Sequence, residues 1–67
     1  MNAPHVERMI VEARELAARS NALTTFLEGQ VFSTLEPTDQ QLLRAQYASM
    51  GAYLTILNLR IARADAI

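Results

Sequence analysis

The segment from Leu42 to Ala64, LLRAQYASMGAYLTILNLRIARA, is the feature that most constrains the fold. On a helix of about 100° per residue, one apolar stripe recurs every three or four positions. The stripe consists of Leu43, Tyr47, Met50, Leu54, Leu57 and Ile61. A second band of apolar or small residues comprises Leu42, Ala45, Ser49, Ala52, Ile56 and Leu59. A surface helix usually carries one stripe about 100° wide, whereas this arc spans about 200°, so we predict burial on two sides.

The preceding residues predict a first long helix over about 4–28. Pro4 suits the first turn, where the missing N–H costs nothing, and Asn2 could cap it. The apolar positions again recur in threes and fours: Val6, Met9, Ile10, Ala13, Leu16, Ala17, Leu23 and Leu27. Gly29 is a plausible C-cap for this helix.

Residues 29–38 are expected to form a short connecting turn or helix that folds Phe32 and Leu35 over the end of the helix pair. Thr38, followed three residues later by Gln41, matches a capping box, which predicts that the second helix begins at Asp39. This helix should continue to about residue 64. Two helices with a short connection normally pack antiparallel.

We therefore predict one all-α domain over residues 1–67, an antiparallel helical hairpin that packs into a homo-oligomeric helical bundle. A chain this short buries little of its surface, and it contains no Cys that could form a disulfide. Association of the second helix with its symmetry mates would cover its second band. A dimer forming a four-helix bundle is the simplest arrangement, and a trimer or higher ring is open.

Charge and composition argue against several classes of protein. The net charge is −1, and we expect no duplex nucleic acid partner because such modules usually carry a basic face. No apolar run approaches the roughly 18 residues of a membrane span, and the first residues lack the apolar core of a signal peptide. We expect a cytoplasmic protein without membrane association.

The sequence shows no recognisable catalytic motif. His5 is the sole histidine, and no nucleophile motif or Gly-rich phosphate loop is present. The glutamates of the first helix lack the Glu-x-x-His pattern of di-metal bundles. We therefore expect no enzyme, no catalytic residue, no metal and no cofactor.

The candidate site is a polar file spaced by seven, Gln46, Tyr53 and Arg60, which runs between the two apolar bands. In one interpretation the file lines a ligand pocket at a subunit junction: Tyr53 stacks on a base or hydrogen-bonds, Gln46 reads an amide-like edge, and Arg60 grips a phosphate. In the other, these groups bond to each other across an interface and fix its register.

A second file, Glu12, Arg19 and Phe26, lies beside the stripe of the first helix. Arg19 is either another phosphate clamp or the partner of Glu12 and Glu15 in weak surface ion pairs.

The pattern resembles that of short phage-encoded proteins, including those of crAss-like phages. The likeness rests on a Glu-rich first helix, Phe-x-x-Leu and Leu-Leu-x-x-Gln followed by Met, Tyr, Ile-Leu and Arg. The matching positions here are Phe26, Phe32, Leu35, Leu42, Leu43, Gln46, Met50, Tyr53, Ile56, Leu57 and Arg60. The resemblance implies a small accessory phage protein acting in an infected bacterial host.

Several helical phage proteins of similar size, such as the anti-CBASS and anti-Thoeris hairpins, are sponges that bind cyclic nucleotide signals at subunit junctions. By analogy, we expect a non-enzymatic sponge for a small anionic nucleotide signal, with Gln46, Tyr53, Arg60 and Arg19 as ligand-binding residues. The alternatives are a helical module that binds and inhibits a host protein, and a structural or regulatory phage bundle.

Overall fold

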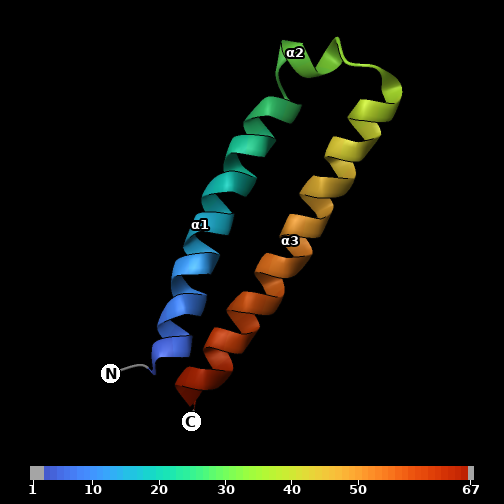
Figure 1. The fold of residues 1–67 in the computed structure, drawn as a ribbon. Coiled ribbons are helices and arrows are strands. Elements are labelled where there is room, and N and C mark those ends of the chain that lie inside the picture. Colours follow the sequence, from blue (N-terminus) through green and yellow to red (C-terminus); the bar gives the residue numbers. More distant parts are fainter. Residues whose placement is uncertain (1–2, 67) are drawn as a thin grey trace.

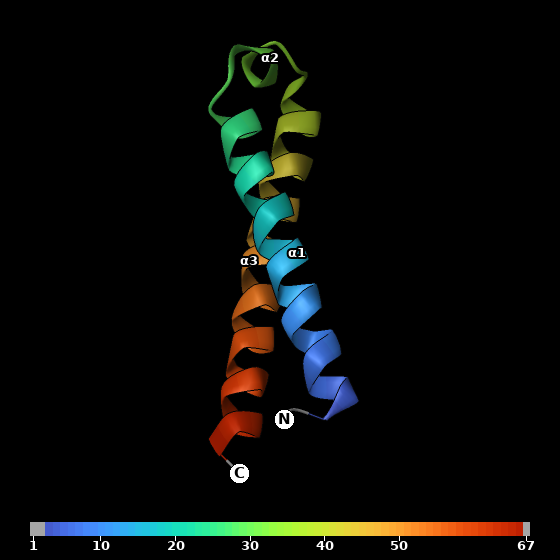
Figure 2. The ribbon, with the colours of Figure 1, turned by 90° about the vertical axis from the view of Figure 1, so that its left-hand side faces the viewer.

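The computed structural model describes residues 3–66 and consists of helices α1 (Pro4–Leu27), α2 (Gln30–Ser33) and α3 (Pro37–Ala66). No strand occurs among these residues, so the all-α prediction is confirmed. Helices α1 and α3 lie side by side and run in opposite directions, with α2 across one end and both chain ends at the other (Figure 1). Figure 2 shows that the two long helices cross at a shallow angle. The result is a rod of 48 × 14 × 14 Å.

Helix α1 begins where the sequence predicts, with Pro4 in its first turn. The extended residue Ala3 is the N-cap, and its carbonyl accepts hydrogen bonds from the backbone N–H groups of Val6 and Glu7 at 2.9 and 3.1 Å. Asn2, the expected cap, lies outside the described residues.

The end of α1 differs from the expectation for Gly29. Glu28 is the C-cap, in right-handed helical conformation, and its N–H donates to the Thr24 carbonyl at 3.2 Å. Gly29 has φ −87° and ψ 169°, and it is the N-cap of α2. The prediction of a Gly29 C-cap is therefore wrong, because the chain turns directly into α2 and needs no left-handed residue there.

The predicted capping box at the start of the second helix is also wrong. Helix α3 begins at Pro37, two residues before the expected start, so Thr38 is already helical. Proline has the φ of a first helical residue and keeps the preceding residue out of the helix. The first intrahelical bond runs from the N–H of Gln40 to the carbonyl of Glu36 at 3.0 Å.

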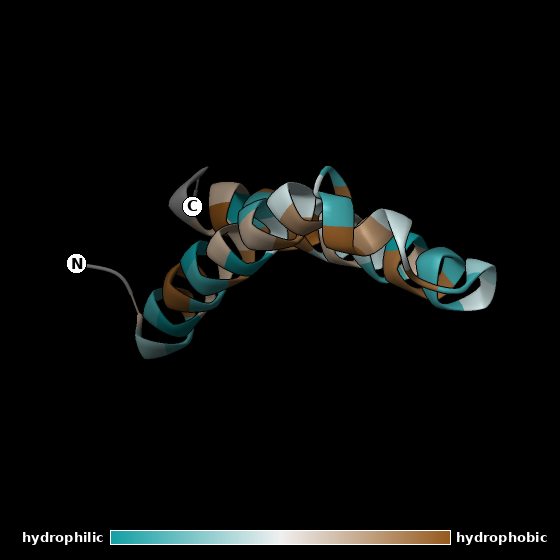
Figure 3. Ribbon diagram, turned by 90° about the horizontal axis from the view of Figure 1, so that it is seen from above, coloured by the Kyte–Doolittle hydropathy of each residue, from teal (hydrophilic) through white to brown (hydrophobic). Residues whose placement is uncertain are grey.

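The main core lies between the N-terminal half of α1 and the C-terminal half of α3. Its buried members are Val6, Met9, Ala13, Leu16 and Leu57, and Ile10, Met50, Leu54, Ile61 and Ala64 pack against them. Leu57 is fully buried, at 0% exposure. Both apolar stripes predicted from the three-and-four spacing thus meet here, and Figure 3 shows hydrophobic and hydrophilic segments alternating along the helices.

A separate small cluster closes the α2 end. Phe32 is buried, its ring meets that of Phe26 edge-on with centroids 6.4 Å apart, and the Arg44 guanidinium lies 5.0 Å from its centroid. The side-chain amide of Gln40 donates to the carbonyls of Phe32 at 3.0 Å and Leu35 at 3.1 Å. Phe32 thus folds over the end of the helix pair, as the sequence predicts.

The second apolar band of α3 faces away from α1 and is uncovered in the single chain. Leu42, Ile56 and Leu59 are 62%, 51% and 62% exposed. We call Leu42, Ala45, Ser49, Ala52, Ile56 and Leu59 the outer band. Its exposure agrees with an arc wider than one partner helix can cover.

The Gln40 bonds generate the first prediction. Gln40→Ala should lower the free energy of unfolding by about 1–2 kcal/mol, because two carbonyls at the end of α2 lose their donor. In a chain of this size the melting temperature should fall by about 4–8 °C per kcal/mol, measured by circular dichroism.

Gln41→Ala is the matched control, since Gln41 is exposed one position further along the same helix turn. It should leave the melting temperature unchanged. Equal effects of the two substitutions would contradict a specific role of Gln40 and would restore the capping-box interpretation of Gln41.

Candidate functional site

Among the described residues, one hydrogen bond between side chains joins the two long helices, on the polar side of their seam. The Tyr53 hydroxyl donates to Oε2 of Glu12, with a donor–acceptor distance of 2.7 Å. Glu12 belongs to α1 and is half-buried, and Tyr53 belongs to α3 and is 42% exposed. A hydrogen bond to an ionised acceptor at this distance is among the stronger ones in proteins.

This bond also fixes which residues of the two polar files face each other. Arg19 follows Glu12 by seven positions, and Gln46 precedes Tyr53 by seven. In an antiparallel pair these equal steps keep Arg19 at the same level as Gln46. By this spacing argument, Glu12 shares one side of the helix pair with the four predicted ligand-binding residues, and we call these five residues the polar flank: Glu12, Arg19, Gln46, Tyr53 and Arg60. The side-chain contact that the structure gives within the polar flank is the Tyr53–Glu12 hydrogen bond.

The polar flank is open in the single chain. Gln46, Arg60 and Arg19 are exposed, and none of the described side chains over residues 3–64 that is buried is polar or charged. The packing of α1 against α3 therefore does not bury the polar file Gln46, Tyr53 and Arg60. The described residues of the single chain leave these groups unenclosed.

The Tyr53 hydroxyl is held in its neutral form by its surroundings. The hydrogen bond to Glu12 raises the pKa of Tyr53 above its ordinary value, and partial desolvation and the Glu12 charge act in the same direction. The positive charge of Arg60 acts in the opposite direction and lowers the pKa of Tyr53, but it is the weakest of these influences. The Tyr53–Glu12 pair is therefore the part of the polar flank whose geometry the structure defines directly.

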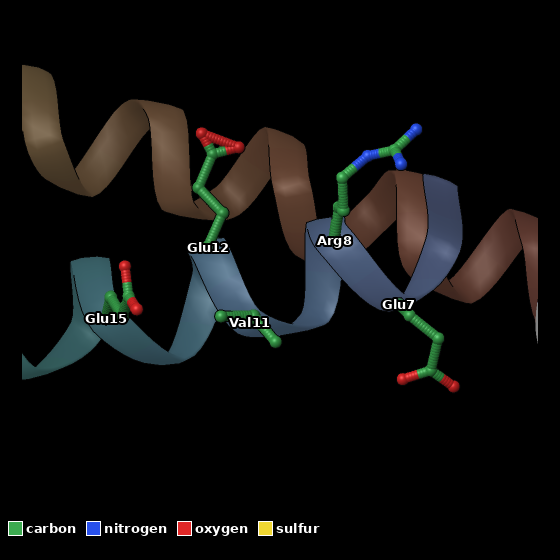
Figure 4. Close-up of a pocket in the computed structure, with 5 residues that line it drawn as sticks. All are labelled: Glu7, Arg8, Val11, Glu12 and Glu15. Carbon is green, nitrogen blue, oxygen red and sulfur yellow. The ribbon is translucent and has the colours of Figure 1, made fainter. Parts of the chain in front are cut away.

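A shallow hollow of about 470 Å³ adjoins Glu12 on the outer surface of α1. It is lined by Glu7, Arg8, Val11, Glu12 and Glu15. Figure 4 shows Glu12 and Arg8 pointing to one side of the helix and Glu7 to the other. All five residues come from α1, so none of the residues that the structure describes lines the hollow from the opposite side.

The described residues contain no group of three or more His, Cys, Asp or Glu side chains placed to hold a metal ion. No helix in residues 3–66 is long and apolar enough to cross a membrane.

The sequence did not predict the hydrogen-bond partner of Glu12. One of the two interpretations of the second file has Glu12 and Glu15 share Arg19 in surface ion pairs, whereas in the structure Oε2 of Glu12 accepts a hydrogen bond from the Tyr53 hydroxyl. The common spacing of seven in the two files was the available signal. The sequence did not reveal the relative register of the helices, so it could not pair the files.

The fold and the polar flank together define a small all-helical protein with an exposed polar site. Its described residues contain no cluster of side chains that could hold a metal ion. Residues 3–63 match the family described as Sequestin, and the chain belongs to that family.

A relative from Enterobacteria phage T4 supports the phage character of the chain. It is described as an uncharacterized 7.5 kDa protein in the denB-rIIB intergenic region, and it is 39% identical over 56 residues, covering 84% of this chain and 88% of the relative. The predicted likeness to short phage proteins is confirmed, while a narrower likeness to proteins of crAss-like phages stays a prediction. No solved structure matches the chain.

The Tyr53–Glu12 bond generates a pH prediction. In a Tyr47→Phe background, Tyr53 is the sole tyrosine, so ultraviolet absorbance reports its ionisation alone. Its midpoint should lie above the ordinary tyrosine value of about 10. The raised pKa means that the bond stabilises the fold below the unfolded-state pKa, and that this contribution is lost as pH rises through the folded-state value.

Two further variants test the cause of the shift. Glu12→Gln should lower the midpoint, because it removes the negative charge, and Arg60→Ala should raise it, because it removes the opposing positive charge. An unchanged midpoint in both variants would show that Tyr53 does not interact with either group in solution.

Proposed function

We propose that this protein is a non-enzymatic phage counter-defence protein that acts in the cytoplasm of the infected host. It assembles into an oligomeric sponge and sequesters a small anionic nucleotide signal, cyclic in form, at its subunit junctions. The observation that carries the proposal is the position of the polar flank, beside an apolar band that its own chain leaves exposed. The family name, Sequestin, denotes sequestration and agrees with this role.

The side chains of the polar flank suit a nucleotide. Arg60 and Arg19 offer planar guanidinium groups that can hold a phosphate through two parallel hydrogen bonds. Tyr53 offers an aromatic face for stacking on a base, and Gln46 offers both a donor and an acceptor for a base edge. A flank with two cations and an aromatic ring thus favours a small anion with a planar part.

Assembly is proposed because the outer band and the polar flank adjoin each other on α3. A second copy packed on Leu42, Ile56 and Leu59 would remove three large apolar side chains from water. The same copy would stand beside the polar flank and supply the missing wall of the site. Contact through identical surfaces produces a closed, symmetric oligomer, of which a dimer is the simplest.

Assembly can be tested with a charge in the outer band. Leu59→Glu should reduce the light-scattering mass to that of a single chain at micromolar concentration, because a buried, unpaired carboxylate is costly. Asn58→Glu is the matched control, since Asn58 is exposed and lies outside the outer band; it should preserve the assembled mass. A folded wild-type monomer at this concentration would contradict the proposal.

Ligand binding can be tested by calorimetry against cyclic dinucleotides, cyclic trinucleotides and cyclic ADP-ribose isomers. Arg60→Ala should weaken binding by about tenfold to a hundredfold, the loss expected for a charge-assisted hydrogen bond, and should leave the assembled mass unchanged. Arg14→Ala, on an exposed position outside the polar flank, is the control and should bind as the wild type does.

Two outcomes would count against the sponge. The absence of heat for every ligand, with the oligomer intact, would contradict nucleotide binding. Loss of assembly in Arg60→Ala would instead support a role of the polar flank in fixing the interface register.

The exposed outer band also supports a second candidate, a module that binds and inhibits a host protein. Large exposed apolar patches commonly mark protein interaction sites. The two candidates differ in the purified oligomer: an outer band that stays solvent-exposed favours a host protein, and a covered one favours the sponge.

A further inference from the structure

Glu12 is the one residue of the polar flank that does not suit an anion-binding site. Its carboxylate is negatively charged and would repel a phosphate, yet it lies in the flank beside Tyr53. A residue that served only to join α1 to α3 could be a neutral acceptor such as Gln. A carboxylate held beside Tyr53, on a flank that also carries arginines, is suited to a ligand that has hydrogen-bond donors close to its phosphates.

The geometry of Glu12 leaves it able to accept a further bond. Oε2 receives the Tyr53 hydroxyl at 2.7 Å, and an ionised carboxylate has two oxygens with about four acceptor positions in total. Oε1 and the second lone pair of Oε2 thus have capacity for another donor. Because Glu12 is only half-buried and adjoins the open hollow on α1, that donor can reach it from outside the chain.

The Tyr53 bond holds the carboxylate in place before any ligand arrives. The Tyr53 hydroxyl donates a hydrogen bond to Oε2 of Glu12 at 2.7 Å. A side chain whose rotamer is already fixed loses less entropy when it forms a second bond. Arg60, seven positions after Tyr53 on the same face of α3, supplies a cation that a phosphate would need.

Nucleotides combine a phosphate with hydrogen-bond donors, since a ribose places hydroxyl groups within a few bonds of a phosphate. We infer that Glu12 is a specificity-determining residue that accepts a hydrogen bond from a sugar hydroxyl of the bound nucleotide, so that the polar flank selects ribonucleotides over deoxyribonucleotides and over simple phosphates. This inference rests on the proposed nucleotide binding and specifies the class of ligand.

The test compares matched ligands on matched variants by calorimetry. The probes are 3′,3′-cyclic GMP-AMP and cyclic ADP-ribose, each beside analogues that lack one ribose hydroxyl, with inorganic phosphate as a third ligand. The proteins are the wild type, Glu12→Gln and Tyr53→Phe. Glu12→Gln keeps an acceptor for Tyr53 and removes the charge, so the fold should persist, as circular dichroism and light scattering would show.

The inference predicts that the wild type binds a ribose form about tenfold more tightly than at least one of its deoxy analogues, and that this ratio falls to under about threefold in Glu12→Gln. Inorganic phosphate should bind Glu12→Gln more tightly than the wild type, because the repulsion is gone. Tyr53→Phe should reduce the ribose preference less than Glu12→Gln, because it leaves the carboxylate in place but less fixed.

The outcomes separate the inference from the proposed function. If the wild type binds none of the nucleotides, nucleotide binding itself is contradicted, and the inference falls with it. If the wild type binds them but shows no preference for any ribose hydroxyl, or if Glu12→Gln retains the full preference, the nucleotide sponge stands and the role of Glu12 is overturned.

Discussion

The packing of α1 against one side of α3 is the interaction on which the rest of the structure depends. It buries Leu57 completely and gathers the apolar stripe of α1 around it, but a single helix can cover only part of the apolar arc of α3. The outer band is left in water for this geometric reason. The polar flank is the boundary between the covered and the uncovered side, so its position follows directly from the packing.

Because the polar flank lies at this boundary, the single chain forms only part of a binding site. Tyr53 and Glu12 are held by one hydrogen bond across the seam, while Arg19, Gln46 and Arg60 remain exposed. One helix pair provides the floor of a site but not its walls. In the proposed sponge, ligand binding and self-association are therefore linked, and anything that strengthens one should strengthen the other.

The all-helical fold could be predicted from the sequence because the three-and-four spacing of Val6, Met9, Ala13 and Leu16 has no other regular solution. The helix ends were harder, since Gln40 and Gln41 offer similar chemistry one residue apart and tertiary contacts with Phe32 and Leu35 select Gln40. The members of the polar file could be named from their spacing. Their partner Glu12 could not, because pairing across two helices depends on a register that no local pattern specifies.

The uneven distribution of the core along the rod has a consequence for how the molecule opens. Most buried side chains of the described residues lie in the half of the rod that contains the start of α1 and the end of α3, whereas the α2 end depends on Phe32 and a few hydrogen bonds. Chain ends usually fray before the interior of a fold. Here we expect the opposite order: the helix pair opens first at the α2 end, because fewer buried side chains hold it together there.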